Sequence, residues 1–244
     1  MQYNTSTMTA KEQAAFDTGL RSYMLGVYNY MMMGLAVIGA AALFINVSGN
    51  AALENAVRSL YLPAFLALIG LGFFSKKLYM DGSATRGQAV FWIEVALWSV
   101  VVAGFSSAYN LQSVIKVFFM TSALFGAISL YGYTTNRNLT PFAQAAGMIM
   151  LGLILLMLVN IGFAVFGGQP LFAGGLWSIL VSVLVIVLVS VMAAWETQNI
   201  KQMYYALYTN GQASAKFAVL GASMLLSSFV VLFIHLLSLF GGRD

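Results

Sequence analysis

Seven long apolar segments occupy most of this 244-residue sequence and limit what it can fold into. A helix needs about 20 apolar residues to cross the hydrocarbon core of a bilayer. With 61% hydrophobic and 7% charged residues, the chain has too few polar side chains to cover a water-soluble domain of this size. We therefore predict an all-α integral membrane protein with seven transmembrane helices. The segments span approximately residues 22–46, 58–75, 88–108, 113–133, 142–166, 171–195 and 217–240.

Two local signals refine these boundaries. Pro63 near the start of the second segment is compatible with a helix that begins near this proline or with one that kinks there. Ahead of the first segment, Thr9 is followed three residues later by Glu12, which fits a capping box and predicts a short helix leading into the first span. We divide the chain into a cytoplasmic N-terminal segment, residues 1–21, and a seven-helix transmembrane domain, residues 22–244.

The basic residues predict an orientation in the membrane. If the N-terminus is cytoplasmic, only Arg58 and Arg243 fall in segments on the opposite side, while Lys116 lies just inside the outer end of the fourth helix. Because Lys and Arg concentrate on the cytoplasmic side, we expect the N-terminus inside and the C-terminus outside. The net charge of +4 therefore indicates topology, and nucleic-acid binding is not expected. The cytoplasmic cations are Lys11, Arg21, Lys76, Lys77, Arg86, Arg137, Lys201 and Lys216.

Several functions of seven-helix proteins are excluded by residue type. The last apolar segment, residues 217–240, contains no lysine to carry a retinal Schiff base. A serine protease would need Ser223 close to His235, but twelve residues along one helix separate them by about 18 Å. With one histidine and no cysteine, the usual zinc sites cannot be built. We find no constellation that predicts an enzyme.

Two polar residues inside apolar segments are candidates for function. Glu94 lies about six residues, or roughly 9 Å, inside the third segment. An ionisable residue at this depth is a candidate functional site, although a lone carboxyl can also be structural if it is protonated or reaches toward the headgroups. His235 in the last segment can carry a proton, or it can simply be a packed histidine.

Glu196 is the stronger candidate because it lies where the sixth segment ends. It precedes Lys201 by five positions, so it lies about 7 Å further into the membrane than that cation. Near a helix C-terminus the macrodipole disfavours negative charge and favours protonation. The alternative is a carboxylate at a helix end that is already in contact with solvent.

Several stretches resemble one known family. Residues 118–135, FFMTSALFGAISLYGYTT, are similar to the fourth helix of the transmembrane Bax-inhibitor-motif family, and the YGYTT motif is typical of its bacterial branch. Further similarities occur in the same order at Arg21-Ser22-Tyr23-Met24, residues 150–160, residues 196–201 and residues 221–233. The resemblance implies a bundle with helix seven at its centre, in a bacterial inner membrane. It also implies a pH-sensitive calcium leak controlled by two acids that share a proton between helices six and seven.

The chain departs from the family pattern at the second acid. The stretch Trp195-Glu196-Thr197-Gln198 matches the first acid, but Ser228 stands where the family has the second aspartate. The Arg-Asp pair after helix four is Arg137-Asn138 here, and Arg137 is most simply a topology determinant. A serine supplies no second charge, so we expect a degraded switch and weakened calcium binding at Glu196.

Two functions follow from this departure. One is a cation leak with Glu196 and Ser228 as the ion or proton gate. In this case Glu94, or Ser227 and Ser228 together, would replace the missing calcium ligand, although nothing in the spacing requires helix three to face helix seven. The alternative is a non-transporting membrane regulator, which would bind a membrane-anchored quality-control protease through the N-terminal segment or the loop at residues 196–216.

Overall fold

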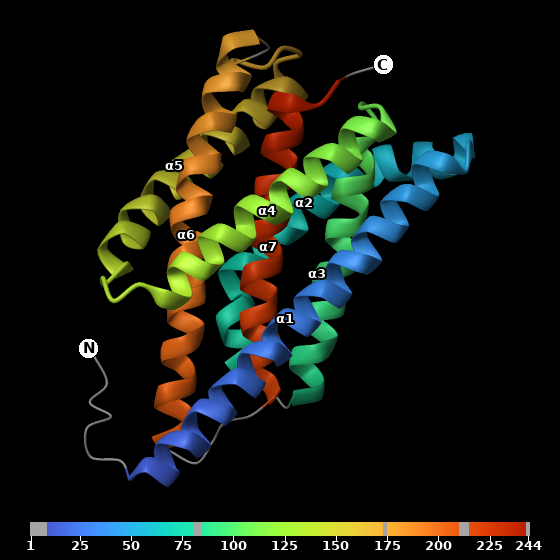
Figure 1. The fold of residues 1–244 in the computed structure, drawn as a ribbon. Helices are drawn as coiled ribbons and strands as arrows, with labels where there is room; N and C mark the ends of the chain where they lie inside the picture. Colours follow the sequence, from blue (N-terminus) through green and yellow to red (C-terminus); the bar gives the residue numbers. More distant parts are fainter. Residues whose placement is uncertain (1–8, 81–83, 173–174, 210–214, 243–244) are drawn as a thin grey trace. The chain divides into compact units, whose positions relative to one another are not determined.

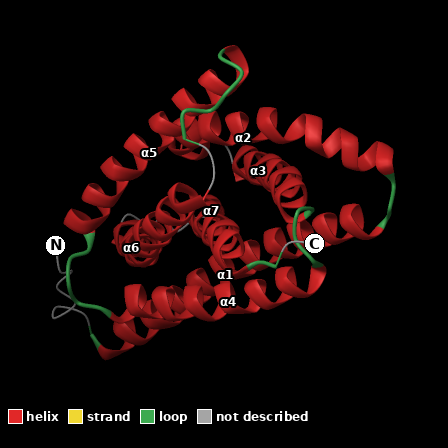
Figure 2. Cartoon of the chain, turned by 90° about the horizontal axis from the view of Figure 1, so that it is seen from above, coloured by secondary structure: helices red, strands yellow, loops and turns green. Residues whose placement is uncertain are grey.

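The protein is all-helical in a computed structural model that describes residues 9–80, 84–172, 175–209 and 215–242. Within these residues there are seven helices and no strand (Figures 1 and 2). All seven are long and apolar enough to cross a membrane, so the predicted class of multi-pass membrane protein is confirmed. The helices are α1 (Ala10–Val47), α2 (Ala51–Met80), α3 (Ala84–Ser106), α4 (Leu111–Thr134), α5 (Thr140–Phe166), α6 (Gly175–Thr209) and α7 (Ala215–Phe240).

The capping box predicted at the start of the first helix is present. The Thr9 backbone N–H donates to Glu12 Oε2 at 2.8 Å, and the Glu12 backbone N–H donates to Thr9 Oγ1 at 3.4 Å. These two bonds satisfy backbone donors that a helix start leaves unpaired. The helix then continues without a break, so the expected short helix and the first span form a single helix of 38 residues.

Helix α2 begins well before the proline in its sequence. The Asn50 side chain accepts the backbone N–H of Ala52 at 3.0 Å, which caps the helix, and Pro63 lies inside it. The prediction that the helix might begin near Pro63 is therefore wrong. An interior proline removes one backbone hydrogen bond, and membrane helices tolerate this because neighbouring groups satisfy the freed carbonyl.

Helix α6 extends fourteen residues beyond the predicted end of the sixth segment, to Thr209. Hydropathy falls after Trp195, but the residues that follow include good helix formers such as Gln, Lys, Met and Ala and contain no glycine or proline before Asn210. The first glycine after this point is Gly211. The predicted loop at residues 196–216 is therefore helical as far as Thr209, which changes the setting of Glu196.

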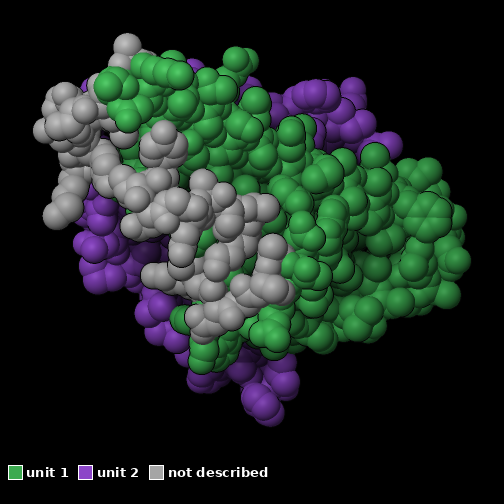
Figure 3. All heavy atoms as spheres, turned by 90° about the horizontal axis from the view of Figure 1, so that it is seen from below, with its two compact units in different colours: residues 1–107, 196–227 green, residues 108–195, 228–244 purple. Residues whose placement is uncertain are grey.

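The chain forms two compact units, which Figure 3 shows in different colours. Unit 1 contains residues 1–107 and 196–227, and unit 2 contains residues 108–195 and 228–244. Helices α6 and α7 each contribute residues to both units. In unit 1, α3 packs against α1 and α2. In unit 2, α4 comes so close to α6 that a Cβ on Gly132 would overlap the Ala194 carbonyl oxygen.

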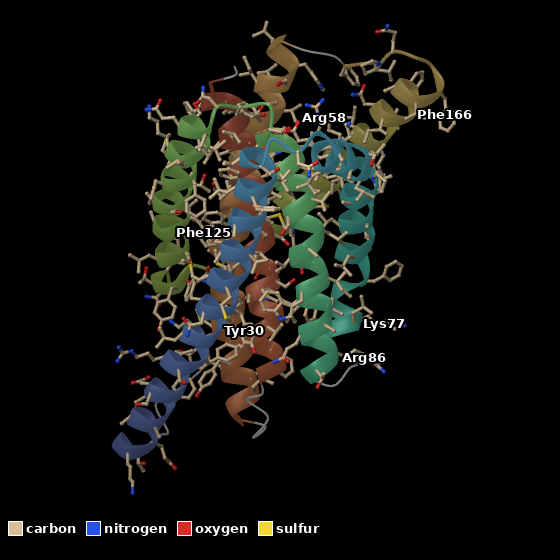
Figure 4. All side chains as sticks on the ribbon, turned by 90° about the vertical axis from the view of Figure 1, so that its right-hand side faces the viewer. Tyr30, Arg58, Lys77, Arg86, Phe125 and Phe166 are labelled. Atoms are coloured by element: carbon tan, nitrogen blue, oxygen red, sulfur yellow. The ribbon has the colours of Figure 1, made fainter. Side chains whose placement is uncertain are left out.

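Basic side chains mark the ends of the unit 1 helices. Figure 4 shows Lys77, near the end of α2, and Arg86, near the start of α3, at the same end of these helices. Arg58 lies toward the other end of α2 in the same view. Such positions allow long basic side chains to reach the headgroups while the helix between them stays in hydrocarbon. Glu94 lies on α3 beyond Arg86, in this hydrocarbon-spanning part.

Helix α7 is the most buried of the seven, and α5 is the least. In the most apolar window of α7, 78% of the residues are buried, compared with 0% in α5. The expected position of helix seven at the centre of the bundle stays a prediction. Helix α5 exposes large apolar side chains, including Met148 and Phe166, which a lipid environment accommodates.

Candidate functional site

Glu94 lies near the middle of a membrane-spanning helix. The span in α3 begins at Thr85, so Glu94 is nine residues, or about 14 Å, inside it. This is deeper than the sequence suggested, because α3 begins at Ala84 and not at residue 88. Half of a typical hydrocarbon core is about 15 Å. Only 6% of Glu94 is exposed, so its carboxylate depends on protein partners.

Two serines of α7 supply the shortest hydrogen bonds to this carboxylate. Ser223 Oγ donates to Glu94 Oε2 at 2.5 Å, and Ser227 Oγ donates to Glu94 Oε1 at 2.5 Å. Residues four apart lie on the same face of a helix, so one face of α7 presents both hydroxyls to α3. Helix three therefore does face the first half of helix seven, which the sequence could not establish.

Two further side chains complete the group. The Tyr79 hydroxyl, from the last turn of α2, donates to Glu94 Oε2 at 3.4 Å. Burial raises the pKa of Tyr79, which lies outside the apolar span of α2, so its hydroxyl stays protonated and can donate. Trp98, one turn after Glu94 on α3, donates its indole N–H to Ser227 Oγ at 3.4 Å. The Ser227 hydroxyl therefore accepts from Trp98 while it donates to Glu94.

We call these five residues, Tyr79, Glu94, Trp98, Ser223 and Ser227, the Glu94 site. It joins three helices of unit 1 through one carboxylate and four neutral polar groups. Hydrogen bonds donated to a carboxylate stabilise its ionised form, whereas burial favours its neutral form. A protonated carboxyl also changes from acceptor to donor at one oxygen. The arrangement can therefore bind and release a proton and rearrange its hydrogen bonds when it does so.

Glu196 is also buried within a helix, which corrects the setting predicted for it. Only 6% of the residue is exposed, and the adjoining Thr197 and Gln198 are also buried. The alternative of a solvent-exposed carboxylate at a helix end is therefore wrong. The macrodipole argument fails as well, because α6 continues for thirteen residues beyond Glu196 and the dipole acts within the last turn.

The other predicted site residues belong to unit 2 and are not part of the Glu94 site. Ser228 is buried on α7, and its expected partnership with Glu196 stays a prediction. His235 lies with its Nδ1 at 3.2 Å from Ser182 Oγ on α6. Arg137 is exposed in the connection between α4 and α5, where its backbone N–H donates to Thr135 Oγ1 at 3.3 Å.

Sequence reasoning identified Glu94 and Ser227 but missed three members of the site. Ser223 and Ser227 are four residues apart, as are Glu94 and Trp98, so the spacing held a signal for two polar helix faces. Nothing in the sequence pointed to Tyr79, which follows the apolar part of α2. Among the described residues, no three Asp, Glu or His side chains gather closely enough to hold a metal ion.

The chain is similar to a family and to several bacterial proteins along nearly its whole length. The family model described as "Inhibitor of apoptosis-promoting Bax1" matches residues 20–244. The "Uncharacterized protein RP147" of Rickettsia prowazekii is 31% identical, with 100% of this chain and 99% of that protein covered. An uncharacterized protein of Caulobacter vibrioides is 32% identical, with 99% and 96% covered. The "Inner membrane protein YbhL" of Escherichia coli K12 is 30% identical, with 92% and 93% covered.

Proposed function

Because this chain belongs to the Bax inhibitor family, and because it buries carboxylates inside membrane-spanning helices, we propose that it is a pH-sensitive cation leak. Its place is a bacterial inner membrane, since the relative from Escherichia coli carries the name of an inner membrane protein. The N-terminus is cytoplasmic and the C-terminus lies on the opposite side, as the distribution of Lys and Arg favours.

The observation that carries this proposal is the position of Glu94 between α3 and α7. Ionised Glu94 accepts hydrogen bonds from Ser223 and Ser227, which ties the first half of α7 to α3. Hydrogen bonds to a charged acceptor are roughly twice as strong as neutral ones, so protonation weakens this tie. The proton therefore favours movement of α7 relative to α3, and the leak increases as the pH falls.

Glu196 serves in this proposal as a second proton acceptor. It is buried on α6, but Ser228 provides a hydroxyl where the family resemblance implies an acid. Two acids sharing one proton are therefore not available at these two positions, since a serine does not ionise in this range. Calcium is therefore not held at these two positions by a pair of acids.

The test is cation flux into liposomes that contain the purified protein. Entry of calcium and of protons is followed with enclosed dyes at about pH 8 and about pH 6, on either side of neutrality. We expect flux to rise at the lower pH in the wild type. Glu94→Gln, which cannot ionise, should give the same raised flux at both values.

Glu54→Gln is the matched control, because Glu54 lies in the first turn of α2, away from the Glu94 site. It should keep the wild-type pH dependence. Glu196→Gln tests the second proton acceptor. It should reduce the difference in flux between the two pH values without abolishing that difference. Flux that is absent at both pH values in wild type and Glu94→Gln, from protein that is folded and monodisperse, would contradict the leak. Flux that appears only in Ser228→Asp would show that the second acid is indispensable.

The second candidate is a membrane regulator that binds a quality-control protease. The observation that favours it is an aromatic contact in unit 1, in which the N-terminal part of α1 packs on the C-terminal part of α6. The Phe16 ring stacks on Tyr205 with centroids 4.9 Å apart and lies 5.3 Å from the Tyr204 ring. A photo-crosslinker at exposed Gln202 should then reach a membrane-anchored protease. Such a crosslink, found together with silent liposomes, would favour this function over the leak.

A further inference from the structure

We propose that the ligand of the Glu94 site is a single proton. When this proton binds, Ser223 changes from donor to acceptor in its hydrogen bond with Glu94. The inference deepens the proposed function and rests on it for the role of the proton in the leak. It adds to the proposed function that the site excludes metal cations, and it names a positioning residue.

The charge of the site matches a monovalent ligand. Glu94 is its only ionisable acid, and the other partners are hydroxyls and an indole. A proton makes the group neutral, whereas a divalent cation would leave a net positive charge buried in the membrane, which is costly. Calcium also takes six to eight oxygen ligands, roughly. The site offers five oxygens, and two of these belong to the same carboxylate.

The direction of the hydrogen bonds favours a proton over a sodium ion. Ser223, Ser227 and Tyr79 all direct their hydrogens toward the carboxylate. A bound metal cation would need the oxygen lone pairs of these hydroxyls instead. Sodium would therefore have to break three hydrogen bonds, while a proton on one carboxyl oxygen requires one of them to reverse.

Among the groups that form the site, Glu94 is the one carboxyl that can take up a proton. From α2 the carboxylate meets Tyr79, and from α7 it meets two serines. Helix α1 also packs on α3, and its Tyr30 contacts α3 at Gln88, whose Nε2 donates to the Tyr30 hydroxyl at 3.0 Å. Tyrosine titrates far above neutrality, at about 10 in model peptides. A proton taken up at the site below the range of tyrosine therefore belongs to Glu94.

The two serines differ in their freedom to reverse. Ser227 already accepts the indole N–H of Trp98, so its oxygen is engaged and its own hydrogen stays directed at Glu94 Oε1. Ser223 accepts no such bond from Trp98, and its other neighbour is the Tyr79 hydroxyl, which can rotate as its own hydroxyl can. When Oε2 gains the proton, the new O–H donates to Ser223 Oγ. Ser223 keeps its own proton and turns it toward the Val219 carbonyl, four residues earlier, as helical serines commonly do.

The proposal is tested by infrared spectroscopy on the full-length protein in liposomes, titrated from about pH 8 to about pH 5. The C=O band of a protonated carboxyl that disappears in Glu94→Gln is assigned to Glu94. In Ser227→Ala the ionised form loses a fixed donor, so the midpoint of this band should move to higher pH by about one unit. In Ser223→Ala the ionised and the protonated carboxyl each lose a hydrogen-bond partner. The pH midpoint should therefore move less than it does in Ser227→Ala.

The frequency of the C=O band shows which serine accepts the hydrogen bond of the protonated Glu94 carboxyl. Ser223→Ala removes the acceptor of the carboxyl proton, so the C=O band should shift in frequency, whereas Ser227→Ala should shift it less. Ser223→Thr keeps the hydroxyl and should restore the wild-type band. Ser99→Ala is the control, because the Ser99 hydroxyl is buried on α3 but donates to the Val95 carbonyl at 2.8 Å. Equal midpoint shifts and no frequency change in the two alanine variants would overturn the role of Ser223.

Ions provide the test of ligand class. The titration is repeated in choline, sodium and calcium chloride at constant ionic strength, and the midpoint should be the same in all three. A midpoint that sodium or calcium moves to lower pH would mean that the metal competes for the site, and the proton assignment would be overturned. If the band titrates as expected while liposomes show no flux, the leak fails and this inference stands. If flux depends on pH but no band is lost in Glu94→Gln, this inference fails, and the leak stands with a proton acceptor other than Glu94.

Discussion

Glu94 illustrates how a carboxylate is kept in an apolar helix without a basic partner among its hydrogen-bonded neighbours. Three hydroxyls donate to it, and an indole holds one of these hydroxyls in place. A buried polar network is stable only when its members satisfy one another, because an unpaired member bears the full cost of desolvation. The Glu94 site meets this condition with side chains from three helices, so its hydrogen bonds also hold those helices together.

Tyr79→Phe tests which partner matters at this scale. Its bond to Glu94 is long, 3.4 Å, compared with 2.5 Å for each serine. Because burial raises the pKa of Tyr79 above its usual value, the hydroxyl stays protonated well beyond pH 8 and takes up no proton in the working range. We expect the pH midpoint of the flux to move by less than it does in Ser227→Ala. A larger displacement would show that Tyr79 is the main partner.

At the scale of helices, close contacts between backbones fix where small residues must stand. Gly132 belongs to the YGY motif of α4, and a Cβ there would overlap the backbone of Ala194 on α6. A backbone atom cannot turn aside as the end of a side chain can. The motif therefore has a physical cause in unit 2, because a small residue allows the two helices to approach closely.

Gly132→Ala should destabilise unit 2 by about 1–3 kcal/mol, the usual cost of overpacking. The measurement is the temperature of unfolding in detergent. Gly126→Ala on the same helix is the matched control, because a Cβ at Gly126 would meet nothing within 4 Å. Alanine is a better helix former than glycine, so this variant should be neutral or slightly more stable. Equal losses in the two variants would contradict the contact with α6.

The contact between α1 and α6 in unit 1 can be tested by relief of a clash. A Cβ at Gly19 would overlap the Tyr204 hydroxyl, so Gly19→Ala should lower the unfolding temperature. Tyr204→Phe removes the hydroxyl that this Cβ would overlap. The double variant should be more stable than Gly19→Ala alone, which a double-mutant cycle reports as coupling. Additive losses would mean that the two residues do not meet.

At the scale of the whole molecule, what the sequence could predict depended on the kind of signal. Seven helices followed from seven apolar segments, because the thickness of the membrane sets their length. The end of α6 was misjudged because hydropathy falls at Trp195 while helix propensity continues to Thr209. The pairing of Glu94 with Ser223 and Ser227 could not be predicted, since one sequence records spacing along helices but not which helices meet.

The topology is a prediction of its own at this scale. Because the sequence contains no cysteine, a single cysteine can be introduced at Gln13 or at Gly242. Each can then be labelled with a thiol reagent from either side of the membrane. We expect Gln13→Cys to react only after the membrane is made permeable to the reagent, and Gly242→Cys to react in intact cells, after removal of any outer membrane barrier. The reverse pattern would contradict the orientation inferred from the Lys and Arg residues.

The most direct test of the account compares two midpoints in the same liposomes. One is the pH at which cation flux is half-maximal, and the other is the pH at which the infrared band of Glu94 is half titrated. We predict that the two coincide in the wild type and move together to higher pH in Ser227→Ala. A flux midpoint that stays fixed while the Glu94 band moves would show that another group controls the leak.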